Sequence, residues 1–312
     1  MELITDINTW NFRGEGIVTI GAFDGVHFGH QRILTRLNEL KTEQNQKTIV
    51  FTFNPHPRKV LFPEQTDLQM LTSRAEKLKL IESLGTDILI EFPFSLEFSQ
   101  IEPLDFISEI LVKKLHVKKL VIGYDHKFGK NREGNLQTFK EQATKYNYTV
   151  EEIPAQEIDD INISSTKIRK ALFDGSIKEA TKYLGYFYPL QGKVVEGKKL
   201  GRTIGYPTAN IQLFDKEKLI PKTGVYLTRV EVNGGDYYGM MNIGFNPTTD
   251  SDNKLKLEVN IFNFDKDIYG KEIDVKLIER IRDEEKFNSI EELKNKIKSD
   301  ETICKQLIQQ IG

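Results

Sequence analysis

The sequence predicts an α/β chain of two domains: a doubly wound parallel sheet, followed by a small antiparallel β-barrel with a terminal helix. Up to about residue 185, short β-branched runs alternate with amphipathic helical patterns. Beyond that point, strand patterns separated by glycine-containing turns dominate. The first pattern is typical of βαβ units and the second of a barrel. Because 312 residues are enough for two domains, we expect them at 1–185 and 186–312.

The first half contains the strands and helices of a layered sheet. Strands are expected at residues 17–23, 48–53, 87–92, 117–123 and 148–153. Helices are expected after His30, after the capping pair Thr72-Ser73, from Pro103 to Leu115, and from near Asn135. The runs 49–51 and 120–122 are apolar without interruption, as in parallel strands that are buried on both faces.

The second half reads as antiparallel strands and one helix. Alternating patterns cover 224–232 and 237–243, and Asn-Gly-Gly-Asp between them is a hairpin turn signal. Further strands are expected at 255–262 and 273–281, where Glu279 interrupts the alternation. A final helix is expected from Ser289, with Glu292 as its capping-box partner, to about Lys298 or onward to Ile311.

Composition excludes several classes of protein. With 44 basic and 46 acidic residues, the formal net charge is −2, which disfavours a chain-wide nucleic-acid-binding surface. The single cysteine, Cys304, excludes an internal disulfide and a cysteine-built metal site. We find no secretion signal and no apolar run of about 20 residues. The expectation is a cytoplasmic protein with no nucleic-acid, membrane or obligate protein partner.

The most informative stretch is 21–30, G-A-F-D-G-V-H-F-G-H, where the first strand ends and the first helix begins. The carboxyl end of a parallel strand and a helix N-terminus together favour a phosphate site. His27 and His30 can both point at one polyphosphate, and Gly29 leaves the backbone accessible. The spacing alone fits two solvated histidines in a turn equally well. A zinc pair is disfavoured because no third histidine or cysteine is near in sequence.

A second signal is the stretch 163–169, I-S-S-T-K-I-R. Taken alone, it favours a helix cap at Ser164 or Ser165, with Ile168 facing inward. The same helix end would offer hydroxyls, free N–H groups and Arg169 to a triphosphate. Two loops at strand ends, 54–58 and 123–129, complete the rim, and most of their residues fit ordinary loop chemistry equally well.

The second half has its own candidate site at 197–210, G-K-K-L-G-R-T-I-G-Y-P-T-A-N. It lacks the G-K-[ST] ending of a Walker loop and could be only a flexible hairpin. Its glycines would let backbone amides approach phosphates, and Thr208 and Asn210 offer oxygens suited to Mg²⁺. Glu258 lies on an alternating strand with Lys256 and Asn260, where the pattern alone favours a solvent face.

These motifs resemble a known family. The strings G-x-F-D-G-V-H-x-G-H and S-S-T-x-I-R, about 140 residues apart, resemble the nucleotidylyltransferase superfamily and more closely the FAD synthetase half of prokaryotic bifunctional riboflavin kinase/FAD synthetases. G-R-x-x-G-Y-P-T-A-N, the Glu258 strand, D-I-Y-G at 267–270 and R-I-R-D-E-E-K-F at 280–287 look like riboflavin kinase. The resemblance implies a Rossmann-like FMN adenylyltransferase domain followed by a riboflavin kinase domain.

The implied activities are phosphorylation of riboflavin by ATP to FMN, then transfer of AMP from ATP to FMN, giving FAD and pyrophosphate, with Mg²⁺. The resemblance implies catalytic roles for His27, His30, Arg169 and Glu258. It implies ATP or phosphate contacts at Gly21, Phe23, Asp24, Gly29, Ser164, Ser165, Thr166, Gly197, Gly201, Arg202 and Gly205. It implies flavin contacts at Asn54, Pro55, Asp125, Phe128, Arg282 and Phe287, and Mg²⁺ ligation through Thr208 and Asn210.

Two residues depart from the family pattern: His126 replaces an aromatic residue, and Asn260 stands where a histidine is usual. Two alternatives remain open on sequence alone. One is an enzyme with a single active half. The other is a flavin- or nucleotide-binding regulatory protein with inactive sites. An H-x-G-H motif also occurs in tRNA synthetases, but this nearly neutral chain shows no basic region large enough to bind tRNA.

Overall fold

The computed structural model describes residues 1–311 apart from 65–67, 125, 155–162, 198–199 and 246–254. The chain divides into two compact units, residues 1–165 and 166–312. Throughout the described ranges, none of the helices combines the length and the apolar character that a membrane span requires. The boundary expected at 185/186 stays a prediction.

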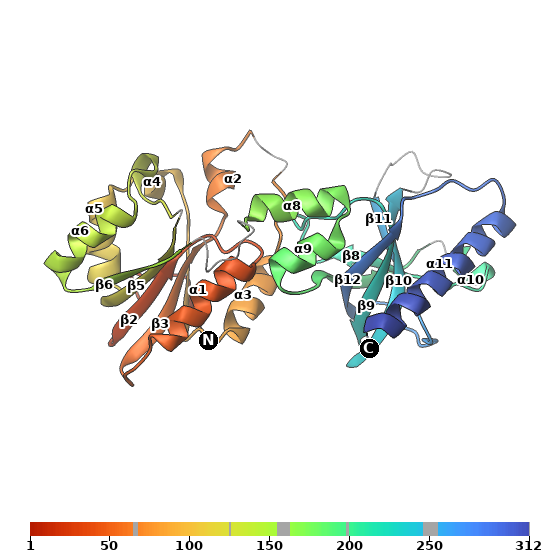
Figure 1. Cartoon of the computed structure of the whole chain (residues 1–312), viewed down its shortest axis with the longest axis horizontal. Coiled ribbons are helices and arrows are strands. Elements are labelled where there is room, and N and C mark those ends of the chain that lie inside the picture. Colours follow the sequence, from red (N-terminus) through yellow and green to blue (C-terminus); the bar gives the residue numbers. More distant parts are fainter. Residues whose placement is uncertain (65–67, 125, 155–162, 198–199, 246–254, 312) are drawn as a thin grey trace. The chain divides into compact units, whose positions relative to one another are not determined.

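The first unit contains a parallel sheet with the strand order β1-β4-β3-β2-β5-β6. Figure 1 labels β2, β3, β5 and β6 of this sheet. Its strands are β1 (Glu2–Ile4), β2 (Glu15–Ile20), β3 (Gln46–Phe53), β4 (Ile88–Phe92), β5 (Val117–Gly123) and β6 (Thr149–Ile153). Every pairing is parallel, which confirms the predicted sheet. The edge strand β1 was not predicted, because three residues are too few to show a periodic pattern.

Helices cover both faces of this sheet. On one face, α1 (Phe28–Glu39) and α3 (Arg74–Ser83) bury Leu34, Leu37 and Ile81 against the strands. On the other face, η1 (Phe106–Val112) and α6 (Leu136–Tyr146) bury side chains that include Phe106 and Phe139. Shorter helices are α2 (Pro57–Leu61), α4 (Leu96–Ser99), α5 (Pro103–Asp105) and η2 (Lys130–Arg132).

Local capping explains two of the helix starts, and one helix differs from expectation. Ser73 of the predicted capping pair forms a capping box with Glu76 at α3. Asn135 caps α6, which begins where a helix was predicted. The helix expected from Pro103 to Leu115 contains a π-helical stretch, in which Lys113 N donates to Ser108 O at 3.1 Å. A π turn is a rare insertion that apolar spacing does not reveal.

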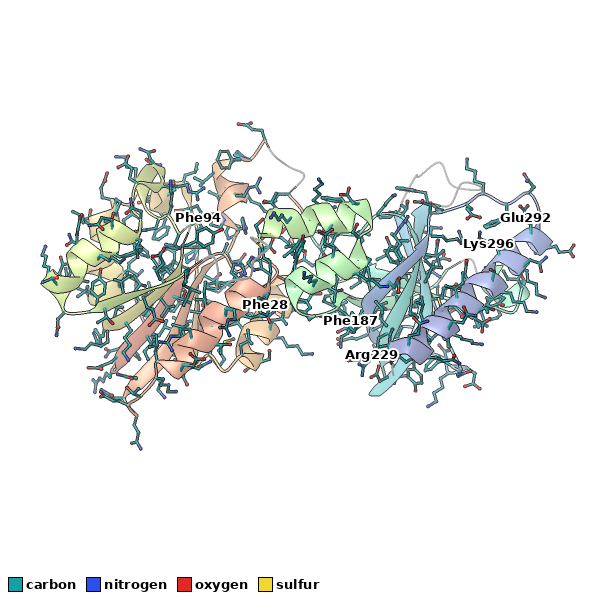
Figure 2. All side chains as sticks on the ribbon, in the orientation of Figure 1. Phe28, Phe94, Phe187, Arg229, Glu292 and Lys296 are labelled. Carbon is teal, nitrogen blue, oxygen red and sulfur yellow. The ribbon has the colours of Figure 1, made fainter. Side chains whose placement is uncertain are left out.

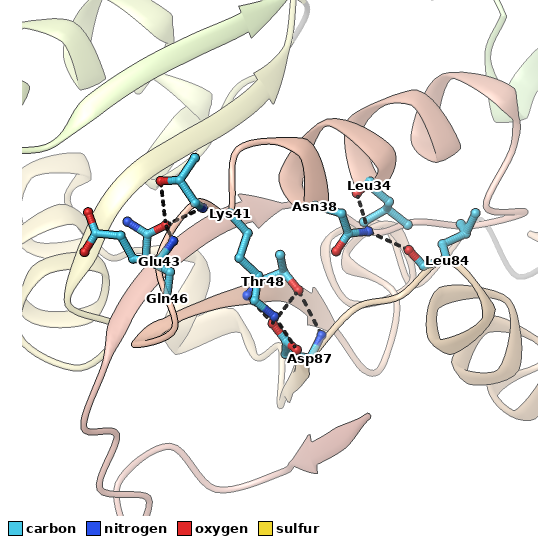
Figure 3. Close-up of polar contacts among 9 residues, drawn as sticks. Leu34, Asn38, Lys41, Glu43, Gln46, Thr48, Leu84 and Asp87 are labelled. Carbon is cyan, nitrogen blue, oxygen red and sulfur yellow. Dashed lines mark hydrogen bonds and ion pairs between the residues drawn. The ribbon is translucent and has the colours of Figure 1, made fainter.

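Polar contacts tie β3 and β4 together at the amino end of the sheet (Figure 3). The Asp87 carboxylate accepts hydrogen bonds from Thr48 N at 2.9 Å and from Thr48 Oγ1 at 3.1 Å, and it pairs with Lys41 Nζ at 2.8 Å. Burial alone would raise the pKa of Asp87, but these bonds hold that pKa below its usual value. The opposite, carboxyl end of the sheet is left for the loops that carry the first motif.

The second unit contains a closed antiparallel barrel with the strand order β10-β11-β8-β7-β12-β9. Its strands are β7 (Tyr188–Val195), β8 (Ala209–Leu213), β9 (Gly224–Val232), β10 (Gly235–Phe245), β11 (Leu255–Ile261) and β12 (Glu272–Arg282). The predicted barrel is confirmed. The register of β12 shifts between Leu277 and Glu279, where the alternation breaks in the sequence.

Helices flank the barrel strands along the chain: α8 (Ser165–Asp174), α9 (Ile177–Leu184), α10 (Leu200–Thr203) and α11 (Ile290–Ile311). The terminal helix extends to Ile311, and its Cys304 packs with Leu227 and Met240 of the barrel. At its start, the Ser289 hydroxyl accepts a hydrogen bond from Glu292 N at 3.1 Å. Figure 2 labels Glu292 and Lys296 on the first turns of this helix.

Candidate functional site

The loop between β2 and α1 has an unusual backbone. Phe23, Gly25 and Val26 have φ angles of 51°, 81° and 33°. A positive φ is costly for a β-branched residue such as Val26, so surrounding contacts must hold it. Gly25 N donates to Thr72 Oγ1 at 3.1 Å, and Val26 N donates to Phe23 O at 3.2 Å.

Asp24 anchors this loop. Its side chain is buried and accepts hydrogen bonds from Leu71 N at 2.9 Å and Thr72 N at 3.3 Å. The Asp24 carbonyl oxygen accepts a hydrogen bond from Ser165 Oγ at 3.0 Å. The hydrogen bond from Ser165 joins two motifs that lie 141 positions apart in the chain. A phosphate contact by Asp24 itself stays a prediction.

The His27 and His30 rings stack, with centroids 3.7 Å apart and planes at 16°. His27 is only 7% exposed, so the alternative of two solvated histidines is wrong. Burial lowers the pKa of His27 to about 4, which Asp24 partly opposes, and burial together with His27 lowers that of His30 well below its usual value. Among the described residues, neither Nδ1 atom has a hydrogen-bond partner. Two neutral imidazoles with unused nitrogens therefore lie side by side at the start of α1.

The other predicted phosphate contacts lie near this pair or on α8. Gly21 and Gly29 bracket the loop, and Gly29 is buried in the first turn of α1. Ser164 is half-buried just before α8, and Thr166 is exposed in its first turn. Thr166 and Arg169 belong to the second unit, and their roles stay predictions.

The predicted flavin contacts of the first unit fall into different environments. Asn54 and Pro55, joined by a cis peptide bond, follow β3. Phe128 is buried and stacks on Phe139, with centroids 4.1 Å apart. Asp125 lies outside the described residues. A flavin contact through Phe128 stays a prediction, and one face of its ring is already covered.

Sequence reasoning missed an aromatic cluster at the carboxyl ends of β3 and β4. Phe53 meets Phe94 edge to face at 5.4 Å, and Phe92 contacts Phe98 at 4.4 Å. Figure 2 labels Phe94 in this region. The alternating phenylalanines at 92 and 94, repeated at 51 and 53, were the available signal.

His126 is half-buried and lies beside an aromatic part of the core. Its ring centroid is 6.2 Å from that of Phe128 and 6.0 Å from that of Phe139. The Nε2 atom is buried and has no partner among the described residues. Burial, and secondarily Arg132, lower the pKa of His126 to about 4. The departure from the family's aromatic residue therefore places a neutral imidazole in a half-buried position against Phe128 and Phe139.

We expect His126→Phe to make the first unit more resistant to acid. A histidine whose folded pKa lies below its unfolded pKa binds protons preferentially when unfolded, so stability falls as pH drops below about 6.5. Between pH 7 and pH 5, the variant should lose about 2 kcal/mol less unfolding free energy than the wild type. Urea denaturation followed by the fluorescence of Trp10, the single tryptophan, measures this. Replacement of the exposed His116 by Gln is the control. If His126→Phe loses as much unfolding free energy as the wild type between pH 7 and pH 5, the lowered pKa of His126 is contradicted.

In the second unit, the glycine-rich stretch approaches the P-T-A-N motif. A Cβ at Gly197 would overlap the Asn210 amide, and a Cβ at Gly201 would overlap the Tyr206 carbonyl oxygen. Gly205 has a φ of 86° and ends the short helix α10. Glycine at the first two positions therefore lets the backbone lie directly against Asn210 and Tyr206.

Glu258 lies opposite Asn210 in the β11–β8 pairing. It is half-buried, so the solvent face favoured by the pattern is only partly correct. Burial raises the pKa of Glu258, and Lys256 partly opposes this. Asn260, two residues along β11, donates from Nδ2 to Pro207 O at 2.7 Å. The departure at 260 thus supplies an N–H donor that fixes the start of the P-T-A-N stretch.

A pocket of about 410 Å³ opens beside these strands. Arg202 and Thr208 contribute to one wall, and residues 264–269 form another. Apolar side chains, including Val259 and Ile261, complete the lining. Of the predicted phosphate and Mg²⁺ contacts, Arg202 and Thr208 line this pocket, whereas Asn210 and the predicted base Glu258 do not. Sequence reasoning had named residues 267–270 only as part of the family pattern.

The predicted flavin contacts Arg282 and Phe287 lie together near α11. The Arg282 guanidinium carbon is 5.8 Å from the Phe287 ring centroid. Arg282 also pairs with the buried Asp300 at 2.8 Å, and Tyr206 donates to Glu301 at 3.1 Å. Asp300 and Glu301 were missed because acidic residues on an amphipathic helix do not stand out in a sequence.

Comparisons with known proteins identify a family for each half of the chain. A family model described as FAD synthetase matches residues 11–167, and one described as riboflavin kinase matches 184–308. A bifunctional riboflavin kinase/FMN adenylyltransferase from Listeria monocytogenes is 38% identical to this chain over 95% of the chain and 91% of the relative. One from Bacillus subtilis is 37% identical over 92% of the chain and 91% of the relative. The chain belongs to the bifunctional riboflavin kinase/FMN adenylyltransferase family.

A solved structure shares the fold. A Streptococcus pneumoniae protein, described as a macrolide-efflux protein, has a TM-score of 0.88 at 34% identity and covers 97% of this chain, which in turn covers 98% of it. The macrolide-efflux description belongs to the Streptococcus pneumoniae protein and is not applied to this chain. Both family models and the curated relatives agree on flavin chemistry for this family.

Proposed function

We propose that each unit of this flavin-cofactor enzyme contributes its own catalytic site. The enzyme phosphorylates riboflavin with ATP to give FMN, then transfers AMP from a second ATP to FMN, releasing pyrophosphate and giving FAD. The observation that carries the two-site assignment is the presence, in separate units, of a stacked histidine pair and of a half-buried glutamate opposite Asn210.

The adenylyl transfer needs no protein nucleophile, because a phosphate oxygen of FMN attacks the α-phosphorus of ATP directly. Catalysis then consists of positioning the reactants and neutralising charge on the departing pyrophosphate. His27 and His30 donate hydrogen bonds to the phosphates, and an arriving triphosphate raises their pKa values toward the charged form. Ser164 and Ser165 hold the outer phosphates, with Gly21, Phe23 and Gly29 shaping the loop. Phosphate contacts by Thr166 and Arg169 stay predictions from the sequence.

The phosphorylation site lies on the barrel. Glu258 takes the proton of the riboflavin 5′-hydroxyl as the oxygen attacks the γ-phosphorus of ATP, the bond from that phosphorus to the β–γ bridging oxygen breaks, and ADP leaves. ATP occupies the pocket at Arg202 and Thr208, with Gly197, Gly201 and Gly205 presenting backbone amides to the phosphates. Arg282 and Phe287 contact the isoalloxazine ring.

Mg²⁺ fits the donor set of the barrel site. Thr208 and Asn210 offer neutral oxygens, and Mg²⁺ usually takes few protein ligands besides nucleotide phosphates. When bound, the ion neutralises phosphate charge. The two domains span 1–185 and 186–312, a division supported by the family models, which end at 167 and begin at 184. Because both reactions consume ATP, we place the enzyme in the cytoplasm.

A single incubation tests the proposal. Purified protein with riboflavin, ATP and Mg²⁺ should form FMN and then FAD, resolved by chromatography, and FMN with ATP should give FAD and pyrophosphate. Chelation of Mg²⁺ should stop both reactions. If FMN forms from riboflavin but FAD does not form, or if FAD forms only from added FMN, a single half of the enzyme is active. Formation of neither would favour the regulatory binding protein.

A further inference from the structure

A line of directly paired residues crosses the outer face of the barrel. Asn210 of β8 pairs with Glu258 of β11, which pairs with Asn242 of β10. Asn242 in turn pairs with Val225 of β9, and Val225 pairs with Arg282 of β12. Directly opposite residues of antiparallel strands project from the same face of a sheet. The predicted metal ligand, base and flavin contact therefore share one row, and Asn242 lies inside it.

Asn242 belongs to the outer face and not to the interior of the barrel. Its neighbours Met241 and Ile243 are fully buried, whereas Asn242 is half-buried. Among the described residues, the Asn242 carboxamide makes no hydrogen bond, so its two donors and one acceptor are available. Val225, the next residue of the row, is buried with Leu227 beside α11, so the row becomes apolar toward this helix.

We propose that Asn242 binds the ribityl hydroxyls of riboflavin and thereby positions the 5′-hydroxyl at Glu258. The inference rests on the proposed kinase function and adds a specificity-determining residue to it. Neighbouring strands lie about 4.8 Å apart, and the five-carbon ribityl chain is longer than this. A chain that begins at Glu258 therefore passes over Asn242. The isoalloxazine ring then lies toward Val225 and Arg282.

The polarity of the row matches riboflavin from one end to the other. Asn210 meets the phosphate end, Glu258 the reacting hydroxyl and Asn242 the polyol. Val225 and Arg282 follow where the substrate becomes aromatic and apolar, with polar atoms at its far edge. A carboxamide suits a polyol because it can donate to one hydroxyl and accept from another.

The decisive experiment compares two substrates. Asn242→Ala should lower kcat/KM for riboflavin about tenfold to a hundredfold while leaving the KM for ATP unchanged. A flavin carrying a hydroxypentyl chain, which keeps the terminal hydroxyl and lacks the other three, should react equally well with wild type and variant. Equal losses on both flavins would overturn the ribityl contact, and so would no loss on riboflavin.

Two further variants guard against a purely structural effect. Asn242→Asp preserves shape and places a second carboxylate opposite Glu258, which should shift the acid limb of the kcat/KM profile to higher pH. Gln212→Ala removes an exposed carboxamide from β8, outside the row, and should change neither substrate's kinetics. An unshifted pH limb in Asn242→Asp would contradict the placement beside Glu258.

The outcomes separate this inference from the proposed function. A wild-type protein that forms no FMN refutes the kinase assignment itself. A wild type that forms FMN, with Asn242→Ala kinetics identical to it, refutes only the role of Asn242. Thermal melting of each variant identifies any loss caused by unfolding.

Discussion

Replacing His27 and His30 together by alanine should abolish FAD formation and leave FMN formation at the wild-type rate. The Nδ1 atoms of the two stacked imidazoles are buried and have no partner among the described residues, and they lie beside the loop that is predicted to bind phosphate. Removing one preorganised donor to a developing oxyanion typically costs a factor of about 10²–10³, so the double variant should fall below detection. Supplying FMN with ATP and measuring pyrophosphate release isolates the first site from the kinase.

The same experiment needs a control for folding. Alanine at both positions also leaves a cavity between Phe23 and the start of α1, since the Phe23 and His30 ring centroids are 5.0 Å apart. The single variants His27→Gln and His30→Gln keep volume and one hydrogen-bonding group, and should retain part of the activity. His116→Ala alters an exposed histidine of the same unit and should be neutral. Loss of FMN formation in the double variant would contradict the two-site assignment.

The sequence was sufficient for the layered sheet because its strands and helices carry strong, different periodicities. The apolar run 49–51 could only be a strand buried on both faces, and residues 49, 50 and 51 are fully buried. Periodicity says nothing of backbone hydrogen bonds, so the π turn in η1 escaped prediction. The family resemblance implied phosphate contacts for both stretches, but only the structure shows the bond from Ser165 to Asp24.

In the barrel, the sequence pattern could not identify the residues that lie beside Glu258. Alternation placed Glu258, Lys256 and Asn260 on one face but could not tell what covers that face. Strand register supplies the missing neighbours, because it brings Asn210 and Asn242 to either side of Glu258. Both come from strands whose relation to β11 depends on long-range pairing, which a local pattern cannot encode.

Glu258→Gln should reduce FMN formation by a factor of about 10²–10⁴, the usual contribution of a positioned general base. The change keeps the shape of the side chain and removes its capacity to accept a proton. Added FMN should still be converted to FAD, because the stacked histidines lie in the other unit. Riboflavin turnover at the wild-type rate would remove Glu258 as the base.

The pH dependence of riboflavin phosphorylation tests the role of Glu258, because the direction of its pKa shift predicts the direction in which the rate changes. Burial raises the pKa of Glu258, so its carboxyl is protonated at a higher pH than an exposed glutamate, and kcat/KM for riboflavin should decline as pH falls through that raised value. Lys256 opposes the rise, so Lys256→Met should move the acid limb to still higher pH. FMN adenylylation should keep its own profile in Lys256→Met. A common shift in both activities would trace the effect to the nucleotide and not to Glu258.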